Sequence, residues 1–439
     1  MVAKLAASQR GNESHIINMT ASDILYNFPR KIDLGLGRVL AALEKLGRPQ
    51  DRVPPIIHIA GTNGKGSTLA FLRAIIEANG QSAHAYTSPH LVHIHERWRI
   101  AGHLITETEL LALAKRVQAL SLNIPVTVFE AETLIAFLAF ADVAADYTLL
   151  EVGLGGRLDA TNVVSAPAMT IITPVDIDHA EMLGNTLTLI ATEKAGILKP
   201  GVACVVARQD PEALEAIEKR AAIAGAPLIV FGRDWDCFEQ RGRLVVQSED
   251  RLLDLPPPSL SGAHQFENAG AAALTMSLLD VDNDAIARGV STAIWPGRLQ
   301  RLMTGPYAEV AHQFGGEIWL DGGHNPHGAR AACAHINKLN VIDPRPFGLV
   351  AGLLSTKDTL GFFAAFAQAN PFVVAVPVRS SDSGMAPADL AKMARSTNLK
   401  ALETETPLDG VKMAFAQLGP RARILICGSL YLAGDVLAA

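Results

Sequence analysis

Residues 60–68 read A-G-T-N-G-K-G-S-T, and this stretch constrains the fold of the chain more than any other feature. The apolar run P-P-I-I-H-I-A at 54–60 leads into it, and apolar residues at helical spacing follow over 67–79. A buried strand, a glycine-rich loop and a helix in this order bring backbone N–H groups and the amino end of a helix to one point. The stretch therefore predicts a phosphate-binding loop between a strand and a helix.

The spacing inside this loop differs from the common P-loop pattern. Gly61 and Gly64 are separated by two residues, and Gly66 stands between Lys65 and Ser67. The Lys65 ammonium would add positive charge at the start of the helix. An ordinary glycine-rich turn between a strand and a helix is the alternative interpretation.

Strands and helices alternate along the rest of the chain. Further strands are predicted at 82–86, 147–152, 169–175 and 202–207, and helices at 130–144 and 187–197. A second series follows W-P-G-R at 295–298, with strands at 317–320, 347–353, 371–376 and 424–427 and a helix from about Pro326. Continuous apolar strands with helical crossovers are typical of a parallel sheet that is covered on both faces.

We therefore predict an α/β protein with two domains. Residues 1–296 would form an N-terminal domain with a P-loop-type parallel sheet, and residues 297–439 a smaller, Rossmann-like C-terminal domain. The strand at 147–152 carries Glu151 near its carboxyl end, where a magnesium ion bound to a nucleotide needs an oxygen ligand.

Composition limits the partners and the compartment. The formal net charge of −6 argues against a general role in binding nucleic acid. The first residues, 1–14, contain no sustained apolar run, and no stretch is long and apolar enough to predict a membrane span. The cysteines form no C-x-x-C pair, which favours reduced thiols in a cytoplasmic protein; they are Cys204, Cys237, Cys333 and Cys427.

Nine short motifs occur in an order that resembles one known family. They are G-T-N-G-K-G-S-T (61–68), T-S-P-H-L (87–91), F-E-A-E-T (129–133), E-V-G-L-G-G-R-L-D-A-T-N (151–162), D-I-D-H (176–179), E-K-A-G-I-L-K-P-G (193–201), H-Q-x-x-N (264–268), W-P-G-R (295–298) and D-G-G-H-N-P-H (321–327). Together they resemble the folylpolyglutamate synthases, including those that are also dihydrofolate synthases, of the Mur ligase superfamily. The resemblance spans nearly the whole chain and also matches the shorter loop.

The resemblance implies an ATP-dependent amide ligase. ATP would activate a carboxylate as an acyl phosphate, and the amine of L-glutamate would then displace phosphate. The expected acceptors are dihydropteroate and reduced folates, the expected cofactors are ATP and two magnesium ions, and the expected assembly is a monomer. A monofunctional folylpolyglutamate synthase, a peptidoglycan Mur ligase, a P-loop phosphotransferase and a catalytically silent nucleotide-binding protein remain alternatives.

The resemblance also assigns residues, first to ATP and metal. The residues implied for ATP are Gly61, Thr62, Asn63, Gly64, Lys65, Gly66, Ser67, Thr68, Asn268, Arg298, Asp321 and His324. The residues implied for magnesium are Ser88, Glu151, His179 and Lys194, and those implied for catalysis are Lys65, His179 and Lys194. For His179 alone, a hydrogen-bonded histidine at a strand end is the alternative, because His is not a preferred magnesium ligand.

The pterin is assigned to a separate group. The residues implied for folate are Asp33, Leu34, Gly35, Leu36, Phe129, Glu130, Leu158, Asp159 and Ala160. D-L-G-L at 33–36 could instead cap a helix, and Asp159 could be a turn residue.

Lys194 is expected to carry a covalent modification. In the family that the motifs resemble, the lysine of E-K-A-G-I is often carbamylated by carbon dioxide, which turns a cation into an anion. A carbamate forms only from a neutral amine, so burial or nearby positive charge should lower the pKa of Lys194. A surface lysine on a helix, paired with Glu193, is the alternative interpretation.

Overall fold

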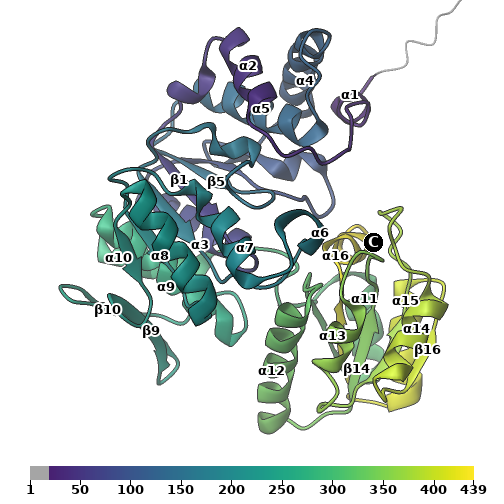
Figure 1. Cartoon of the computed structure of the whole chain (residues 1–439). Coiled ribbons are helices and arrows are strands. Elements are labelled where there is room, and N and C mark those ends of the chain that lie inside the picture. Colours follow the sequence, from purple (N-terminus) through teal and green to yellow (C-terminus); the bar gives the residue numbers. More distant parts are fainter. Residues whose placement is uncertain (1–18) are drawn as a thin grey trace, which may run out of the picture.

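The computed structural model describes residues 19–439, and these residues form two lobes (Figure 1). The stretch 1–14, in which the sequence shows no apolar run, lies outside the described residues. The first lobe contains an eight-stranded sheet and a three-stranded sheet, and the second contains a six-stranded sheet. The predicted α/β fold class with two domains is confirmed.

The eight-stranded sheet is parallel from β2 to β8 and has an antiparallel edge formed by β3 and β4. In spatial order its strands are β4 (His103–Leu104), β3 (Trp98–Ile100), β2 (Ala83–Tyr86), β5 (Tyr147–Glu151), β1 (Ile56–Ala60), β6 (Met169–Ile172), β7 (Cys204–Val206) and β8 (Leu228–Val230). The central strands β5 and β1 end at the same edge, and the glycine loop leaves the sheet there.

Helices cover both faces of this sheet because neighbouring strand residues point to opposite sides. In β1, Ile57 and Ile59 pack with α3 (Lys65–Ala78), α9 (Ala263–Leu278) and α10 (Asn283–Thr292). The opposite face is covered by α1 (Ala21–Leu25), α2 (Gly37–Lys45), α4 (Glu107–Ser121), α5 (Val128–Ala141), α6 (Ala180–Leu183), α7 (Leu187–Lys194) and α8 (Pro211–Ala224).

The six-stranded sheet of the second lobe is built in the same way. Its strands in spatial order are β12 (Gln300–Arg301), β13 (Glu317–Leu320), β17 (Arg423–Cys427), β14 (Phe347–Ala351), β15 (Phe372–Ala375) and β16 (Ala401–Glu403), with β12 antiparallel. One face packs on α12 (Pro326–Ile342), α13 (Thr359–Ala364) and α14 (Pro387–Ser396). The other packs on α11 (Gly305–Phe314), α15 (Pro407–Leu418) and α16 (Leu430–Leu437).

Each predicted strand is present, and the predicted helices correspond to α3, α5, α7 and α12. The three-stranded antiparallel sheet, β9 (Trp235–Gln240), β10 (Arg243–Ser248) and β11 (Leu252–Leu255), was not predicted. Its first turn has positive φ at both Arg241 and Gly242. Such turns are usually signalled by Asn-Gly or Asp-Gly, so the Arg-Gly pair gave no sequence signal.

The strands of the first lobe all precede residue 256, and those of the second lobe begin at Gln300. The domain boundary between residues 296 and 297 falls in this interval and stays a prediction. Within residues 19–439, no helix is long and apolar enough to cross a membrane.

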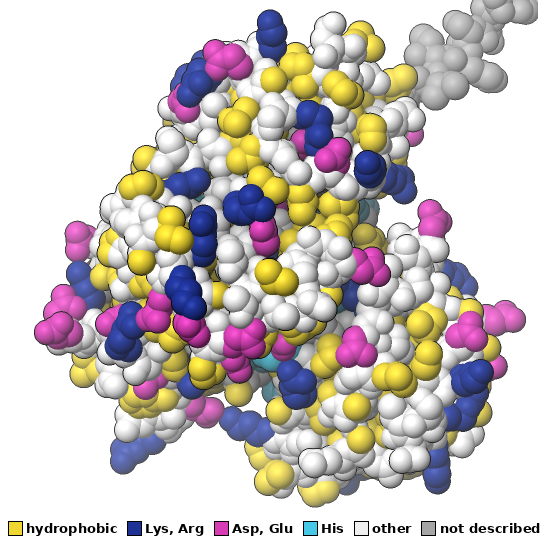
Figure 2. All heavy atoms as spheres, viewed as in Figure 1, with side chains coloured by type: hydrophobic (Ala, Val, Ile, Leu, Met, Phe, Trp, Pro, Cys, Tyr) yellow, Lys and Arg dark blue, Asp and Glu magenta, His cyan; other side chains and the backbone are white. Residues whose placement is uncertain are grey.

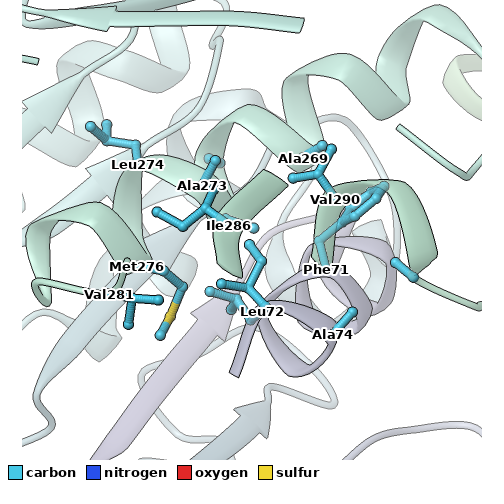
Figure 3. Close-up of a cluster of buried hydrophobic side chains, with 14 of the residues drawn as sticks. Phe71, Leu72, Ala74, Ala269, Ala273, Leu274, Met276, Val281, Ile286 and Val290 are labelled. Atoms are coloured by element: carbon cyan, nitrogen blue, oxygen red, sulfur yellow. The ribbon is translucent and has the colours of Figure 1, made fainter. Parts of the chain in front are cut away.

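The helix that follows the glycine loop is held by a dense apolar contact. Figure 3 shows Phe71 and Leu72 of α3 facing Ala273 of α9 and Ile286 and Val290 of α10. All five side chains are buried. Because α3 begins at the loop itself, this contact fixes the position of the loop relative to α9 and α10.

We predict that Gly289→Ala destabilises the protein by about 1–3 kcal/mol, as overpacking does. A Cβ at Gly289 of α10 would overlap the backbone of Ile75 in α3, so the helices would have to separate. Urea unfolding of the first lobe measures the effect. Gly37→Ala is the matched control, because a Cβ at Gly37 has no neighbour within 4 Å. Equal stability of the two variants would contradict the close contact of the helices.

Candidate active site

A cavity of about 240 Å³ lies between the two lobes, at the carboxyl ends of β1 and β5. Its first-lobe wall includes the glycine loop, Glu151, His179 and Lys194, and its second-lobe wall includes Asp321 and His324. Figure 2 shows histidine side chains in the hollow between the lobes. The carboxyl edge of a parallel sheet, where two domains meet, is a common position for a ligand site.

The glycines of the loop are required by close approach as well as by conformation. Gly64 has φ of 89° and precedes the first residue of α3, and a Cβ there would overlap the amide of Asn268. A Cβ on Gly66 would come within 2.8 Å of the Trp295 ring. Residues from two distant motifs therefore pack directly on the loop, which accounts for its spacing.

Two lysines converge on one backbone oxygen of the loop. The Lys65 ammonium donates to the carbonyl of Gly61 at 3.0 Å, and the Lys194 nitrogen donates to the same oxygen at 2.8 Å. Burial lowers the pKa of Lys194 to about 7, and the positive charge of Lys65 adds to the effect. Burial also lowers the pKa of Lys65. Lys194 is only 6% exposed, so its interpretation as a surface lysine is wrong.

Glu151 lies at the end of β5 beside this pair. Within residues 19–439 its one hydrogen-bond donor is the backbone N–H of Ser88, at 3.4 Å. Burial raises the pKa of Glu151, and the charge of Lys65 opposes that rise. A buried carboxylate with so few partners suits a hard cation.

The donor set fits magnesium better than a transition metal. The described residues contain no group of three or more His, Cys, Asp or Glu side chains placed to hold an ion by themselves. Magnesium usually takes one or two protein carboxylates and completes its shell with phosphate oxygens and water. Glu151 beside a phosphate-binding loop matches that pattern.

Asp178 lines the same cavity and joins the two lobes. Its carboxylate accepts from Lys357 at 2.7 Å and lies 3.3 Å from the His324 ring, both in the second lobe. Burial opposes ionisation, but His324, His179 and Lys357 together hold the pKa of Asp178 well below its usual value. The neighbouring His179 has a positive φ of 53°, and burial lowers its pKa to about 4.

A second set of contacts joins the loop to α12. The side chain of Asn63 lies 2.8 Å from the ring of His327 and accepts from the amide of Asn325 at 3.1 Å. Asp321 is buried, and its carboxylate accepts from the backbone of Leu299 at 2.8 Å and Gly323 at 2.7 Å. Asp321 thus orders the loop after β13.

The other residues implied for ATP lie on the first-lobe side of the cavity or at the junction of the lobes. Asn268 donates to Gln265 at 3.0 Å, and Gln265 donates to Ser67 at 3.3 Å. Arg298 lines the cavity at the junction. Thr68 is buried within α3 and does not line the cavity, so its implied role in binding ATP stays a prediction.

The residues implied for folate do not line this cavity. Asp33 and Glu130 both pair with Arg38, at 3.1 Å each, so this acidic pair is bridged by a cation. Phe129 packs on Gly153, which does line the cavity. Leu36 directly precedes α2, but the side chain of Asp33 does not cap that helix.

Asp159 is part of a buried turn. Its carboxylate accepts from the backbone of Leu154 at 2.8 Å and of Thr161 at 3.0 Å, and it caps the short helix Ala160–Val163. Leu158 and Ala160 flank it outside the cavity lining. This geometry favours the turn interpretation, and the implied role in folate binding stays a prediction.

Comparison with known proteins decides the family. Residues 59–276 match the model of the Mur ligase middle domain. The chain is 32% identical over 424 residues to a Bacillus subtilis dihydrofolate synthase/folylpolyglutamate synthase, covering 92% of this chain and 94% of that protein. It belongs to the dihydrofolate synthase/folylpolyglutamate synthase family of Mur ligases.

Two solved structures of the family resemble this one over nearly their whole length. E. coli FolC in complex with DHPP and ADP has a TM-score of 0.84 at 29% identity, covering 96% of this chain and 97% of that chain. A bifunctional folylpolyglutamate synthase/dihydrofolate synthase with Mn, AMPPNP and L-glutamate bound has a TM-score of 0.82 at 31% identity, covering 96% of this chain and 98% of that chain. The family resemblance read from the nine motifs is confirmed.

Some residues at the synthase site received no individual role from the sequence. Asp178, Asn325 and His327 lie within the quoted motifs, but their contacts depend on how the lobes meet. Lys357 lay in no motif. Its one sequence signal was its place shortly after the apolar strand at 347–353, since residues beyond the carboxyl ends of parallel strands tend to face the site.

We predict that Lys194 titrates near pH 7 in the folded protein. The unfolded chain keeps an ordinary lysine of pKa 10.5 and so binds more protons between about pH 7 and that value. The free energy of unfolding should therefore rise with pH across this window, and Lys194→Met should remove that contribution. NMR of protein with ¹³C-labelled lysine checks the titration. The prediction fails if all lysine signals titrate in the ordinary range.

Proposed function

We propose that this chain is an ATP-dependent amide ligase that joins L-glutamate to dihydropteroate and to reduced folates. The carrying observation is the convergence of the glycine loop, Lys65, Lys194 and Glu151 at one edge of the sheet, closed by Asp321 and His324. The family relatives described above support the substrates. A monofunctional folylpolyglutamate synthase is the second candidate.

The charges around the site suit acyl phosphate formation. A carboxylate must approach a phosphate of like charge, and cations on either side reduce that repulsion. Lys65 and Arg298 supply positive charge from the loop and from the junction of the lobes. A bound divalent cation would supply further charge neutralisation, and in this proposal Glu151 and Ser88 would hold it. We infer a second ion near His179 from the family resemblance.

Carbamylation of Lys194 would reverse the charge next to Lys65. The pKa of about 7 makes a neutral amine available near neutral pH, as the reaction with carbon dioxide requires. Two cations crowded on the Gly61 carbonyl repel each other, whereas a carbamate beside Lys65 would form an ion pair. The modification thus supports metal binding and loop order together.

The two lobes are proposed to act as the ATPase domain and the ligase domain, with the boundary at residues 296 and 297. Contacts of the second lobe with Asn63 and Asp178 would close over bound nucleotide and exclude water from the acyl phosphate. The monomeric state, the cytoplasmic location and the absence of nucleic-acid or membrane partners stay predictions.

We predict that phosphate release from ATP requires magnesium, glutamate and an acceptor. Dihydropteroate and tetrahydrofolate, tested separately, distinguish a bifunctional from a monofunctional enzyme. Lys65→Ala should lower kcat/KM for ATP. The loss should correspond to about 1.5–3 kcal/mol of activation free energy, the size of a lost charge-assisted contact. The control is Lys115→Ala, an exposed lysine of α4. Release of phosphate without any need for glutamate would support a phosphotransferase instead.

We predict that Lys194→Ala abolishes turnover while ATP still binds. Acetate or another short carboxylate should restore part of the activity by replacing the missing anion. Turnover with and without added carboxylate, together with ATP binding by calorimetry, measures both effects. Electron density at the Lys194 nitrogen in a crystal grown with bicarbonate is the direct check. A bare ammonium together with a fully active variant would exclude the role.

A further inference from the structure

A second cavity of about 580 Å³ adjoins the first. It shares part of its wall with the first cavity; the shared residues are Gly66, Ser88, Pro89, Glu151, Arg298 and Leu430. A molecule in the second cavity therefore has access to the same Glu151 carboxylate and glycine loop. None of the residues implied for folate lines it.

The wall of this cavity combines apolar side chains with arginines. The apolar part includes Leu69, Leu91 and Trp295. Three arginines line the cavity: Arg298 at the wall that the two cavities share, and Arg73 on α3 and Arg99 on β3. The guanidinium groups of Arg73 and Arg99 are close enough that the charge of Arg73, after burial, contributes to lowering the pKa of Arg99.

These two arginines carry two positive charges but share a single acidic partner. Arg73 donates to Glu77 at 2.9 Å, and the same carboxylate is the acid that acts on Arg99. Arg99 itself donates to the backbone carbonyl of Gly102 at 2.7 Å. One carboxylate thus serves two half-buried guanidinium groups, which leaves capacity for another anion.

The two acids that line the cavity, Glu96 and Glu151, interact with groups other than these arginines. Glu96 accepts from the backbone N–H groups of Leu91, Val92 and His93 at 2.7, 3.1 and 2.8 Å. Glu151 faces the loop lysine at the junction. Neither carboxylate neutralises Arg73 or Arg99.

His90 adds a neutral donor to the same cavity. The Arg97 guanidinium donates to Nδ1 of His90 at 3.0 Å and to Glu132 at 2.7 Å. A ring nitrogen that accepts from arginine carries no proton, so the neutral ring holds its proton on Nε2. Arg97 and Glu132 therefore keep His90 as a hydrogen-bond donor in the cavity wall.

We propose that Arg73 and Arg99 bind a carboxylate of a glutamyl unit in the second cavity, while the apolar part of the wall covers the uncharged part of the same ligand. This inference rests on the proposed ligase function and names the site for its acidic substrate. The planar, permanently charged arginine pair suits a carboxylate, and the shared wall connects that carboxylate to the reaction centre.

Two substrates carry this chemistry, the incoming glutamate and the glutamyl tail of an already conjugated folate. Dihydropteroate has no glutamyl unit, so with that acceptor only the incoming amino acid can occupy the arginine pair. Comparison of the two acceptors therefore identifies which glutamyl unit is bound.

The test uses the full-length enzyme with Arg73→Gln and Arg99→Gln, and Arg116→Gln on the exposed face of α4 as control. Each cavity variant should raise one KM by about 10-fold or more, as expected for a lost charge-assisted contact. A higher KM for glutamate, measured with dihydropteroate as acceptor, would show that the arginine pair binds the incoming amino acid. A change confined to the KM for a polyglutamylated folate would show that the arginine pair binds the glutamyl tail of the folate.

Arg73→Lys and Arg99→Lys, which keep the charge, should recover part of the loss. Unchanged ATP binding in each variant shows that the fold is intact. If the wild type is active and both KM values stay within about two-fold in all cavity variants, the arginine site is overturned while the ligase function stands. If the wild type shows no glutamate-dependent reaction with either acceptor, both proposals fail.

Discussion

Two lysine side chains share one backbone oxygen in this protein, and the remainder of the site is arranged around that contact. Lys65 and Lys194 both donate to the carbonyl of Gly61, where the glycine loop leaves β1. Burial, together with the positive charge of Lys65, lowers the pKa of Lys194 to about 7. Glu151 lies beside the pair as a buried carboxylate with little hydrogen bonding of its own. The lysines of this cluster favour the binding of an anion, and the Glu151 carboxylate favours the binding of a cation.

The second lobe completes this arrangement through polar contacts. Asp178 pairs with Lys357 and His324, and Asn63 in the glycine loop contacts His327 and Asn325. Apolar contact also crosses between the lobes, since Leu91 of the first lobe packs on an apolar core of the second. Polar and apolar contacts thus meet at the junction of the lobes, where the candidate nucleotide site lies.

The second cavity also carries charged side chains, and we propose that they bind a charged substrate. Arg73 projects from α3, the helix that begins at the loop, and Arg99 projects from the edge strand β3. Because α3 packs on α9 and α10, the position of Arg73 relative to the loop is fixed. An acidic ligand held there would present its other end to Glu151 and Arg298 at the shared wall.

The sequence by itself determined the α/β class, the central strands of both large sheets and the family. Apolar runs and helical spacing report local burial, and motifs such as G-T-N-G-K-G-S-T identify a loop whose backbone shape depends on its own glycines. Expectations that depend on one residue's neighbours in the chain, such as Glu151 at the end of β5, also agreed with the structure.

Only the tertiary structure decided which distant side chains meet. The burial of Lys194 against Gly61, the pairing of Asp178 with Lys357, and the shared position of Arg73 and Arg99 all join residues far apart in the chain. The turn formed by Arg241 and Gly242 was not predicted because arginine is not one of the residues that usually signal a turn with positive φ. Local patterns in the sequence encode which helices and strands form. Contacts between these elements depend on how they pack, and a single sequence does not show which distant residues come together.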